Sequence, residues 1–476
     1  MKVSVTFKIQ PKVDKFISPD FFVGRILYLE VLIMNISEYI LPHKKMILDA
    51  ERWLWEHPQT GYREWDAHNY MVSSFEKLGY EIIPAVNIPG FITDIEISEG
   101  PKILILAELD SLICSEHPES AKDTGYVHAC GHHAQMAALL GLAAALKNPK
   151  VSERWSGSLR LCVVPAEELI ETDYRLDLIN QGIIKYPAGK VEFLHRGYFD
   201  ECDIAFMCHT TGGKDISCSF GGNGAILKRA EFIGKACHAS APNGGLNALY
   251  MAQLGMTAAN AIRETFVDSQ HVRYHPIITH GGQAVNAIPS HVQTESYVRG
   301  ADFNVLKETN IKINRAVAAS AAALGGNVKI NDIFGFAPLI NNEGLIAVMD
   351  EARKMVFPGS VGSGCDGWDM GCTDMGDLSS IMPSLHFFCG GASGTAHGKD
   401  YKIEDPYLAC LGSASAQLYM LDILLNNGSE RAKKVISESE SLFKNKDEFF
   451  ETIKTFSLER EAVNYNEDGT VTLSFC

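Results

Sequence analysis

Short runs of apolar residues alternate with longer apolar stretches through the first half of this chain. Residues 102–108 (KILILAE), 158–164 (SLRLCVV) and 203–208 (DIAFMC) are continuous runs of the length of a β-strand. Residues 134–147, which are almost entirely Ala, Leu, Met and Gly, predict a helix buried against a sheet. Buried strands that alternate with helices predict an α/β fold, in which helices cover a mostly parallel sheet.

Polar side chains follow each of these predicted strands. Asp110 comes just after the first strand, Glu167 and Glu168 follow the second, and His209 follows the third directly. The carboxyl ends of parallel strands form the ligand crevice of such a sheet. These side chains should therefore converge on one site.

A cluster of ligand-type side chains, HACGHH at 128–133, stands before the predicted helix. Its glycine lets the backbone bend around a bound group, and a helix start favours anionic groups. Cys130 and His132, with the strand-end carboxylates, form a ligand set that suits Zn, Mn, Co or Ni better than Mg or Ca. The alternative is a buried cysteine beside ordinary loop histidines, with Glu167 and Glu168 in a solvated turn. The convergence of several strand ends favours the metal site.

From residue 223 onward the pattern changes to strand-like runs interleaved with helices, which predicts a smaller α+β domain. The expected elements are strands at 225–234, 275–280 and 292–300 and helices at 246–265 and 302–324. This domain is predicted to be a lid at 223–338, inserted between two parts of a catalytic domain at 36–222 and 339–426.

Both ends of the chain carry further segments. Residues 1–35 are predicted to be an N-terminal extension. Within it, 21–34 is apolar but is interrupted by Arg25 and Glu30, is too short to span a bilayer and lacks the features of a signal peptide. Residues 427–476, rich in Lys, Glu and Ser, predict an amphipathic helical tail on the outside of the catalytic domain.

Bulk composition limits the partners of the protein. The 476 residues carry a net charge of −16, which argues against nucleic acid and anionic membrane as partners. An anionic small-molecule substrate stays compatible, because metals and an arginine can make a site locally positive. Twelve cysteines without an evident disulfide framework predict a reducing compartment and a cytoplasmic location.

Eight blocks, in order from about Trp53 to Leu425, resemble a known superfamily. This is the dinuclear-metal superfamily of aminoacylases, hippurate hydrolases and glutamate carboxypeptidases (peptidase family M20). The most similar branch has a cysteine ligand and includes aminobenzoyl-glutamate hydrolases and auxin-conjugate hydrolases. The blocks are HPQTGYREWD (57–66), LAELDSL (106–112), HACGH (128–132), VPAEE (164–168), GKACHASAPNGGLNAL (234–249), GGQAVNAIPSHV (281–292), TDMGDLSSIMPS (373–384) and GTAHGKDY (394–401).

The resemblance implies roles for individual residues of the catalytic domain. It implies two divalent metal ions per subunit, with Glu167 as general base and acid. The implied metal ligands are Cys130, His132, Glu168, His209 and His397. Asp110 matches a position near the site, where it would orient a ligand. His397 is implied by the resemblance alone, since a histidine in such a loop is usually just exposed.

In the lid, the resemblance implies a homodimer and three residues that act on substrate. His238 would stabilise the tetrahedral oxyanion, in the site of its own subunit or of the partner, while Asn286 and Arg299 would contact substrate. The alternatives are a turn residue for His238, a helix-capping side chain for Asn286 and an exposed strand-end charge for Arg299.

The chain departs from the family pattern in two places. Relatives have Asp or Asn directly after CGH, whereas this chain has His133, which could replace a hydrogen bond behind the ligands, carry a proton, or do neither. Residues 169–201 are longer than usual and are expected to hold a helix and a loop near the pocket.

The predicted function is metal-dependent hydrolysis of an amide bond in a small N-acyl amino acid, dipeptide or aryl-amide conjugate with a free carboxylate. Two alternatives stay open. The chain could be a catalytically inactive relative that binds a small molecule, or Cys130 could be the nucleophile of a thiol hydrolase.

Overall fold

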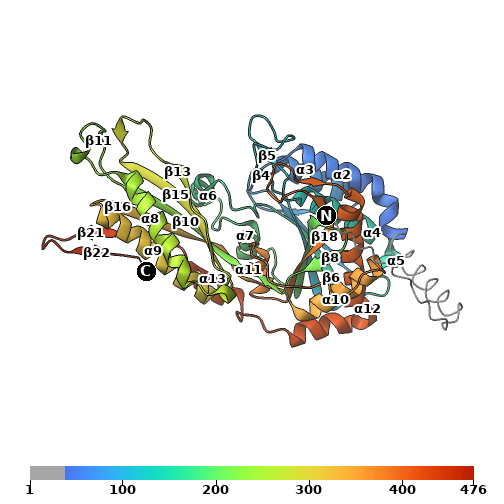
Figure 1. Ribbon diagram of the computed structural model, residues 1–476. Coiled ribbons are helices and arrows are strands. Elements are labelled where there is room, and N and C mark those ends of the chain that lie inside the picture. Colours follow the sequence, from blue (N-terminus) through green and yellow to red (C-terminus); the bar gives the residue numbers. More distant parts are fainter. Residues whose placement is uncertain (1–37, 476) are drawn as a thin grey trace, which may run out of the picture.

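A computed structural model describes residues 38–475, so the predicted extension and its apolar run at 21–34 lie outside the described residues. Besides four two-stranded pairs, the described chain forms two large sheets, each covered by helices, which lie at opposite ends of the molecule in Figure 1. This arrangement confirms the predicted α/β fold with a second, smaller α+β unit.

The larger sheet has four parallel strands at its centre. Along the path its order is β1-β2-β6-β3-β7-β18-β19, and β8 pairs with β18. The pairs β6/β3, β3/β7 and β7/β18 are parallel, and the outer pairs are antiparallel. The strands are β1 (Ile83–Pro84), β2 (Phe91–Glu96), β3 (Lys102–Glu108), β6 (Ser158–Val164), β7 (Ile204–Gly212), β8 (Ile216–Cys218), β18 (Ser384–Ser393) and β19 (Lys402–Ile403).

Alternate side chains of β3 enter two different hydrophobic cores. Ile103 and Ile105 pack with the helices of one face, whereas Leu104 and Leu106 pack with the helices of the other. The first face carries α2 (Lys44–Glu56), α3 (Trp65–Lys77), α4 (His132–Leu146), α10 (Glu343–Val356) and α12 (Ser413–Glu438). The second carries α6 (Thr172–Asn180), α7 (Gly189–His195) and α11 (Met375–Ser379). Burial on both faces explains why the strands read as unbroken apolar runs.

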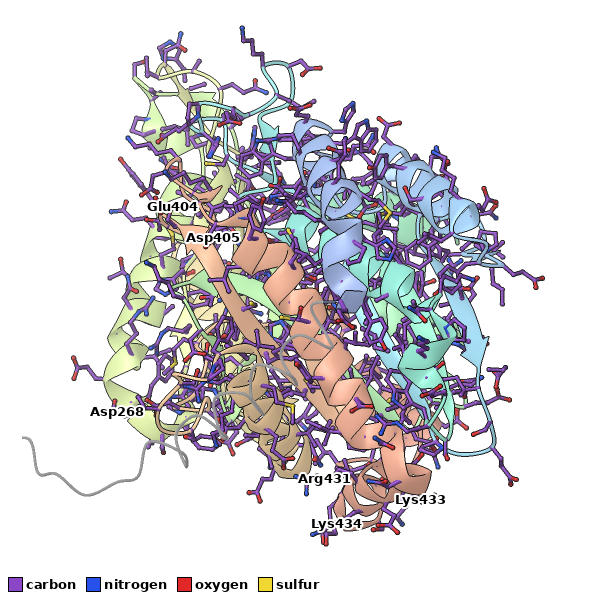
Figure 2. The ribbon with its side chains drawn as sticks, turned by 90° about the vertical axis from the view of Figure 1, so that its right-hand side faces the viewer. Asp268, Glu404, Asp405, Arg431, Lys433 and Lys434 are labelled. Atoms are coloured by element: carbon purple, nitrogen blue, oxygen red, sulfur yellow. The ribbon has the colours of Figure 1, made fainter. Side chains whose placement is uncertain are left out.

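Two of the covering helices are unusually apolar. Every residue of α4 is buried, as its composition predicts. The helical stretch Tyr407–Glu438 is long and apolar enough to cross a membrane, but 72% of its apolar window is buried inside the protein. Figure 2 shows Glu404 and Asp405 near one end of this stretch and Arg431, Lys433 and Lys434 near the other. The helix is therefore part of the core.

The smaller sheet is antiparallel, with the order β12-β15-β10-β16-β20 and β13 paired to β15. Two helices, α8 (Ala248–Ile262) and α9 (Phe303–Ala323), cover it, as the sequence predicts. Its strands are β10 (Gly224–Ile233), β12 (Arg273–Tyr274), β13 (Ile277–His280), β15 (His291–Gly300), β16 (Asn327–Phe336) and β20 (Leu458–Glu461). All of them except β20 fall within the predicted lid.

The prediction of a helical tail on the catalytic domain is wrong for the last part of the chain. After α12 and α13 (Lys446–Lys454), the tail forms β20, which pairs with β16 of the smaller sheet. A hairpin of β21 (Val463–Tyr465) and β22 (Val471–Leu473) follows. Phe449 and Ile453 of α13 are buried in the same core as Phe334 of β16. This pairing over a long sequence distance leaves no mark in the charged sequence LERE of β20.

Candidate active site

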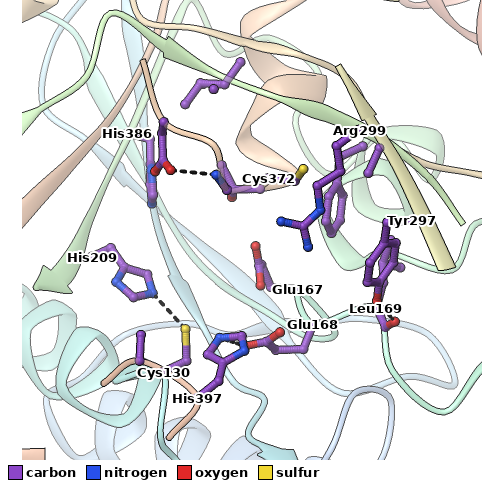
Figure 3. A pocket seen from close by; sticks show the side chains of 18 of the residues that line it. Cys130, Glu167, Glu168, Leu169, His209, Tyr297, Arg299, Cys372, His386 and His397 are labelled. Atoms are coloured by element: carbon purple, nitrogen blue, oxygen red, sulfur yellow. Dashed lines mark hydrogen bonds and ion pairs between the residues drawn. The ribbon is translucent and has the colours of Figure 1, made fainter. Parts of the chain in front are cut away.

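A cavity of about 370 Å³ lies where the strands of the larger sheet end and β15 of the smaller sheet passes over them. Figure 3 shows Glu167 and Glu168 side by side in it, with Cys130, His209 and His397 on one side and Arg299 reaching in from the other. The predicted residues that line this cavity are Cys130, Glu167, Glu168, His209, Arg299 and His397. The strand ends therefore converge as the sequence predicts.

Four overlapping groups of ligand-type side chains gather here; one is the all-carboxylate group Glu108–Glu167–Asp374, and the other three contain histidine. Their ligand atoms lie within 4.8 Å of one another in each of the groups Cys130–His132–His209, Cys130–Glu168–His397 and His132–Glu167–Glu168. Cys130 belongs to two of the groups, and so does His132. Mixed sulfur, nitrogen and carboxylate donors are the set that zinc-like ions accept.

Gly131 allows the cluster to turn into α4. Its φ of 97° lies in the left-handed region, and a Cβ there would collide with the hydroxyls of Thr210 and Tyr401. The left-handed Gly131 lies between Cys130 and His132, whose ligand atoms come within 4.8 Å of each other. The glycine predicted to permit a bend is thus required on steric grounds.

His132 is held by one ring nitrogen. Its Nδ1 lies 2.8 Å from the backbone oxygen of Asp110 and 3.1 Å from Oδ1 of the same residue. An Nδ1–H that donates to Asp110 leaves the lone pair of Nε2 for a metal. Nε2 is buried and makes no hydrogen bond in the described part of the chain, although Oε2 of Glu108 lies 3.2 Å away. A buried imidazole nitrogen without a hydrogen bond fits a metal ligand.

His209, on β7, is held in the same way: a backbone oxygen lies next to one ring nitrogen, and the other ring nitrogen lies near a candidate ligand. Its Nδ1 lies 2.7 Å from the backbone oxygen of Thr210, and its Nε2 lies 3.4 Å from Sγ of Cys130. Burial alone would raise the pKa of the Cys130 thiol, but the imidazoles of His132 and His209 bring it down to about 6. A thiolate at neutral pH is the form that binds metal.

Glu168 is fixed at several points. Its Oε1 lies 3.1 Å from Nε2 of His397, its backbone N–H donates to Oδ2 of Asp110, and its backbone oxygen accepts from Nη2 of Arg175. Burial opposes ionisation, yet the hydrogen bond from His397 holds the pKa of Glu168 below its usual value. Glu168 is therefore held in the ionised form that metal binding would require.

Glu167 has a different environment. No hydrogen bond or ion pair reaches its carboxylate from any residue between 38 and 475, although the residue is only 8% exposed. Burial first, and then the charges of Glu108 and Glu168, raise its pKa well above the usual value. The preceding Ala166 has a φ of 62°, and its N–H donates to Oε1 of the buried Glu64. The two adjacent glutamates thus have opposite pKa shifts, which is typical of an acid–base residue beside a ligand.

A buried charge network that the sequence does not reveal lies behind the glutamates. Lys190 of α7 is completely buried and pairs with Glu108 and Asp374. Oε2 of Glu108 accepts from Gln135 at 2.9 Å and lies 3.2 Å from Nε2 of His132. In the sequence, Glu108 is distinguished only by being a carboxylate at the end of a mostly apolar strand. Lys190 belongs to the long segment 169–201, which holds helices near the pocket as expected.

Three predicted residues lie away from the cavity. His238 of β11 (Cys237–His238) and Asn286, just before β14 (Ala287–Ile288), are exposed neighbours on the lid, where the Ala239 N–H donates to the Asn286 backbone oxygen. His133 points toward α2, with Nε2 at 3.2 Å from Oε1 of Glu51. His133 does not line the cavity and contributes to the packing of α4 against α2.

Several other residues line the cavity although no sequence pattern identifies them. His386, on β18, is buried beside His209, and its Nε2 has no hydrogen-bond partner among residues 38–475. Burial lowers the pKa of His386 to about 3. Cys372 and Asp369 come from the segment before α11, which has no regular pattern that predicts its course.

The comparison with known families decides the classification. The model of "Peptidase family M20/M25/M40" matches residues 104–420, which contain every predicted metal ligand. The chain belongs to this family. The resemblance inferred from the sequence blocks is thereby confirmed, and so is the assignment of the chain as an amidohydrolase or peptidase.

Similar proteins agree with this assignment. The chain is 27% identical to Xaa-Arg dipeptidase of Mus musculus, over 83% of this chain and 86% of the relative. It is 28% identical to N-acetyl-L-cysteine deacetylase of Bacillus subtilis, over 65% and 73%. A solved dinuclear metal-binding peptidase of the M20 family from Bacillus subtilis has a TM-score of 0.59 and 18% identity, covering 80% of this chain and 98% of that one. This M20 peptidase thus shares the fold.

Proposed function

We propose that this M20 protein hydrolyses the amide bond of a small N-acyl amino acid, dipeptide or aryl-amide conjugate that carries a free carboxylate. The substrate's carboxylate would bind Arg299, and its scissile bond would lie over Glu167. Relatives named as a dipeptidase and as an N-acetyl amino acid deacetylase support this range of substrates.

One observation carries the proposal: Glu167 is a buried carboxylate that faces the cavity and has no partner among residues 38–475. A structural carboxylate at this depth would be paired, because an unpaired buried charge costs free energy. A carboxylate with a raised pKa is suited to accept a proton and to give it back.

The donor set fits two divalent ions of the Zn, Mn, Co or Ni type. Cys130, His132 and His209 could hold one ion, and Glu168 and His397 could hold the other with a shared donor. The buried Nε2 of His132, which makes no hydrogen bond to any described residue, supports this assignment. When bound, the ions supply Lewis-acid polarisation of the carbonyl and lower the pKa of water.

The chain's own residues would carry the proton through the reaction. Glu167 takes a proton from the attacking water and then delivers it to the nitrogen of the departing amine. Asp110 keeps the His132 ring in one orientation throughout. Arg299 holds the carboxylate of the substrate with its planar guanidinium, which fixes the amide over Glu167.

His238 and Asn286 would serve the site of a second subunit. They are too far out on the lid to line the cavity of their own chain, and the neighbouring edge strand β13 exposes Ile277 and Ile278. An exposed apolar edge strand is a natural surface for pairing with another copy. We infer a homodimer through the lid, located in the cytoplasm.

The decisive experiment is amine release from N-acyl amino acids, aminobenzoyl-glutamate and dipeptides by metal-reconstituted full-length protein. We expect release that a chelator abolishes and added metal restores, whereas a thiol hydrolase would keep its activity in chelator. Glu167→Gln should retain metal but lose at least about 10²-fold in kcat. Glu153→Gln, on the surface, is the matched control. Metal binding without release from any substrate would favour a binding protein.

A further inference from the structure

Within the described residues, the chain passes between the larger domain and the lid three times. The first two crossings pair with each other as β9 (Gly221–Gly222) and β17 (Leu339–Ile340). The third is the segment 441–461, which follows α12 of the larger domain and ends in β20 of the smaller sheet. We call this segment, which contains α13 and β20, the strap. It lies outside residues 104–420, which match the family model.

The strap packs on the larger domain through α13. The Phe450 ring stacks on the Tyr186 ring, with centroids 5.3 Å apart, and meets the His195 ring edge-on at 5.5 Å. Nζ of Lys446 lies 2.6 Å from Oδ1 of Asp200. Figure 1 shows α13 at the boundary between the two parts of the molecule, beside α11. Phe450 and Tyr186 are both buried, so this contact excludes water.

The strap also packs on the lid. The Phe449 ring lies 6.3 Å from the Phe334 ring of β16, and the Phe334 N–H donates to Oγ of Ser457 at 2.9 Å. In β20, Nη2 of Arg460 lies 3.6 Å from Oδ2 of the buried Asp332. The strap is therefore bound to the lid by a strand ladder, an aromatic contact and an ion pair.

Other contacts between the lid and the larger domain are polar. Oγ1 of Thr172 donates to Oε2 of Glu295 at 3.0 Å, and Arg229 pairs with the exposed Asp173. Exposed polar contacts of this kind stabilise little, because water competes for the same groups. A buried aromatic contact such as that of Phe450 contributes more.

We propose that the strap fixes the orientation of the lid and so holds Arg299 over the cavity. Arg299 is on β15, which lies in the same sheet as β16 and β20. A hydrogen-bonded sheet moves as a unit, so a restraint on β20 also acts on β15. Without the strap, the paired crossings β9 and β17 would serve as a hinge. The role of Arg299 rests on the proposed amide hydrolysis, whereas the restraint of the lid does not.

The first test measures the distance between the domains without using activity. Spin labels on a non-canonical amino acid replace the exposed Glu76 of α3 and Glu308 of α9 in the full-length protein. Double electron–electron resonance then gives the distribution of distances between the labels. We expect one narrow distribution with the wild-type strap. Phe450→Ala should broaden it or add a second distance, because the ring that stacks on Tyr186 is lost.

Further variants show whether a change comes from the strap. Leu425→Ala removes a buried side chain of α12 in the other hydrophobic core, so it should lower stability and leave the distances unchanged. Lys446→Glu, at the surface, places a second carboxylate against Asp200 and should also broaden the distribution. Asp200→Lys in the same chain should narrow it again. This charge exchange tests the strap even where Phe450→Ala fails to fold.

The second test is the hydrolysis of N-acetyl amino acids by the metal-reconstituted full-length protein. If about one tenth of the Phe450→Ala molecules hold the lid in place, KM should rise about tenfold. The value of kcat should stay nearly unchanged, because saturating substrate selects the arrangement with Arg299 over the cavity. A mere loss of folded protein would instead lower kcat and leave KM as it is.

The outcomes separate this inference from the proposed function. The same distribution of distances in the wild type, Phe450→Ala and Lys446→Glu overturns the strap, and so does a broad distribution in the wild type. Changed distances with an unchanged KM overturn its role in placing Arg299. Changed distances in a protein that binds metal but hydrolyses no substrate overturn the proposed function and leave the restraint of the lid standing.

Discussion

Nδ1 of His132 lies 3.1 Å from Oδ1 of Asp110, and the other oxygen of Asp110 accepts the backbone N–H of Glu168 at 2.8 Å. One carboxylate thus orients two candidate metal ligands. Asp110→Asn should weaken metal binding by about 10–100-fold, because the His132 ring loses its charged acceptor. Metal affinity is measured by competition with a chromogenic chelator. Asp66→Asn, on the surface, is the control, and equal affinities in both variants would remove Asp110 from this role.

The Cys130 thiol should react with iodoacetamide at unusually low pH in metal-free protein. Its pKa of about 6 means that the reactive thiolate forms as pH rises through 6. The rate of alkylation should therefore be close to its maximum by pH 7. Cys372 in the same cavity is an internal control, since its pKa is about 12. Peptide mass spectrometry follows both sites. Added zinc should protect Cys130, and an alkylation midpoint near pH 8.5 or above would contradict the thiolate.

Lys190→Met should destabilise the fold, because it removes the buried ammonium that pairs with the carboxylates of Glu108 and Asp374. The expected loss in the free energy of unfolding is about 3–5 kcal/mol, measured by urea denaturation at pH 7.5. Without the ammonium, these groups have pKa values above those of the unfolded chain. Stability is then regained as pH falls and they become protonated.

The matched control for this network is Lys185→Met, an exposed lysine that precedes α7. It should unfold at the same urea concentration as the wild type. A Lys190→Met variant whose loss in stability is the same at pH 5.5 and pH 8 would show that the buried charges are not the cause.

Subunit mixing tests whether His238 acts across a dimer. His238→Ala and Glu167→Gln should each be inactive alone. After equal mixing with subunit exchange, about a quarter of all sites would combine an intact Glu167 with an intact His238 from the partner, and activity should recover accordingly. No recovery, despite exchange shown by a mass-tagged subunit, would place His238 outside the reaction.

The sequence predicts the groups that come from strand ends, and for a physical reason. Parallel strands bring their carboxyl ends to one edge, so Asp110, Glu168 and His209 had to meet once the strands were assigned correctly. Lys190 could not be predicted in the same way. It reaches Asp374 across 184 residues of sequence, and neither residue has a local pattern that identifies its partner.

His238 and β20 show a second limit of sequence reasoning. His238 is on an exposed strand of the lid, and its role depends on a surface that another copy would supply. The Lys- and Glu-rich sequence of the tail predicts an amphipathic helix on the catalytic domain. Its first strand, β20, instead pairs with β16, where an open edge of the smaller sheet can accept a strand that satisfies its backbone hydrogen bonds.

The pairing of β20 with β16 also sets an order of events during synthesis. The lid strands leave the ribosome long before Leu458, so the edge of β16 stays bare while the chain between Phe336 and Leu458 is made. Domains generally fold as they emerge, and unpaired strand edges attract other nascent chains. The smaller domain can therefore be completed only after β20 has emerged, long after its other strands, so this one pairing delays the closing of the edge.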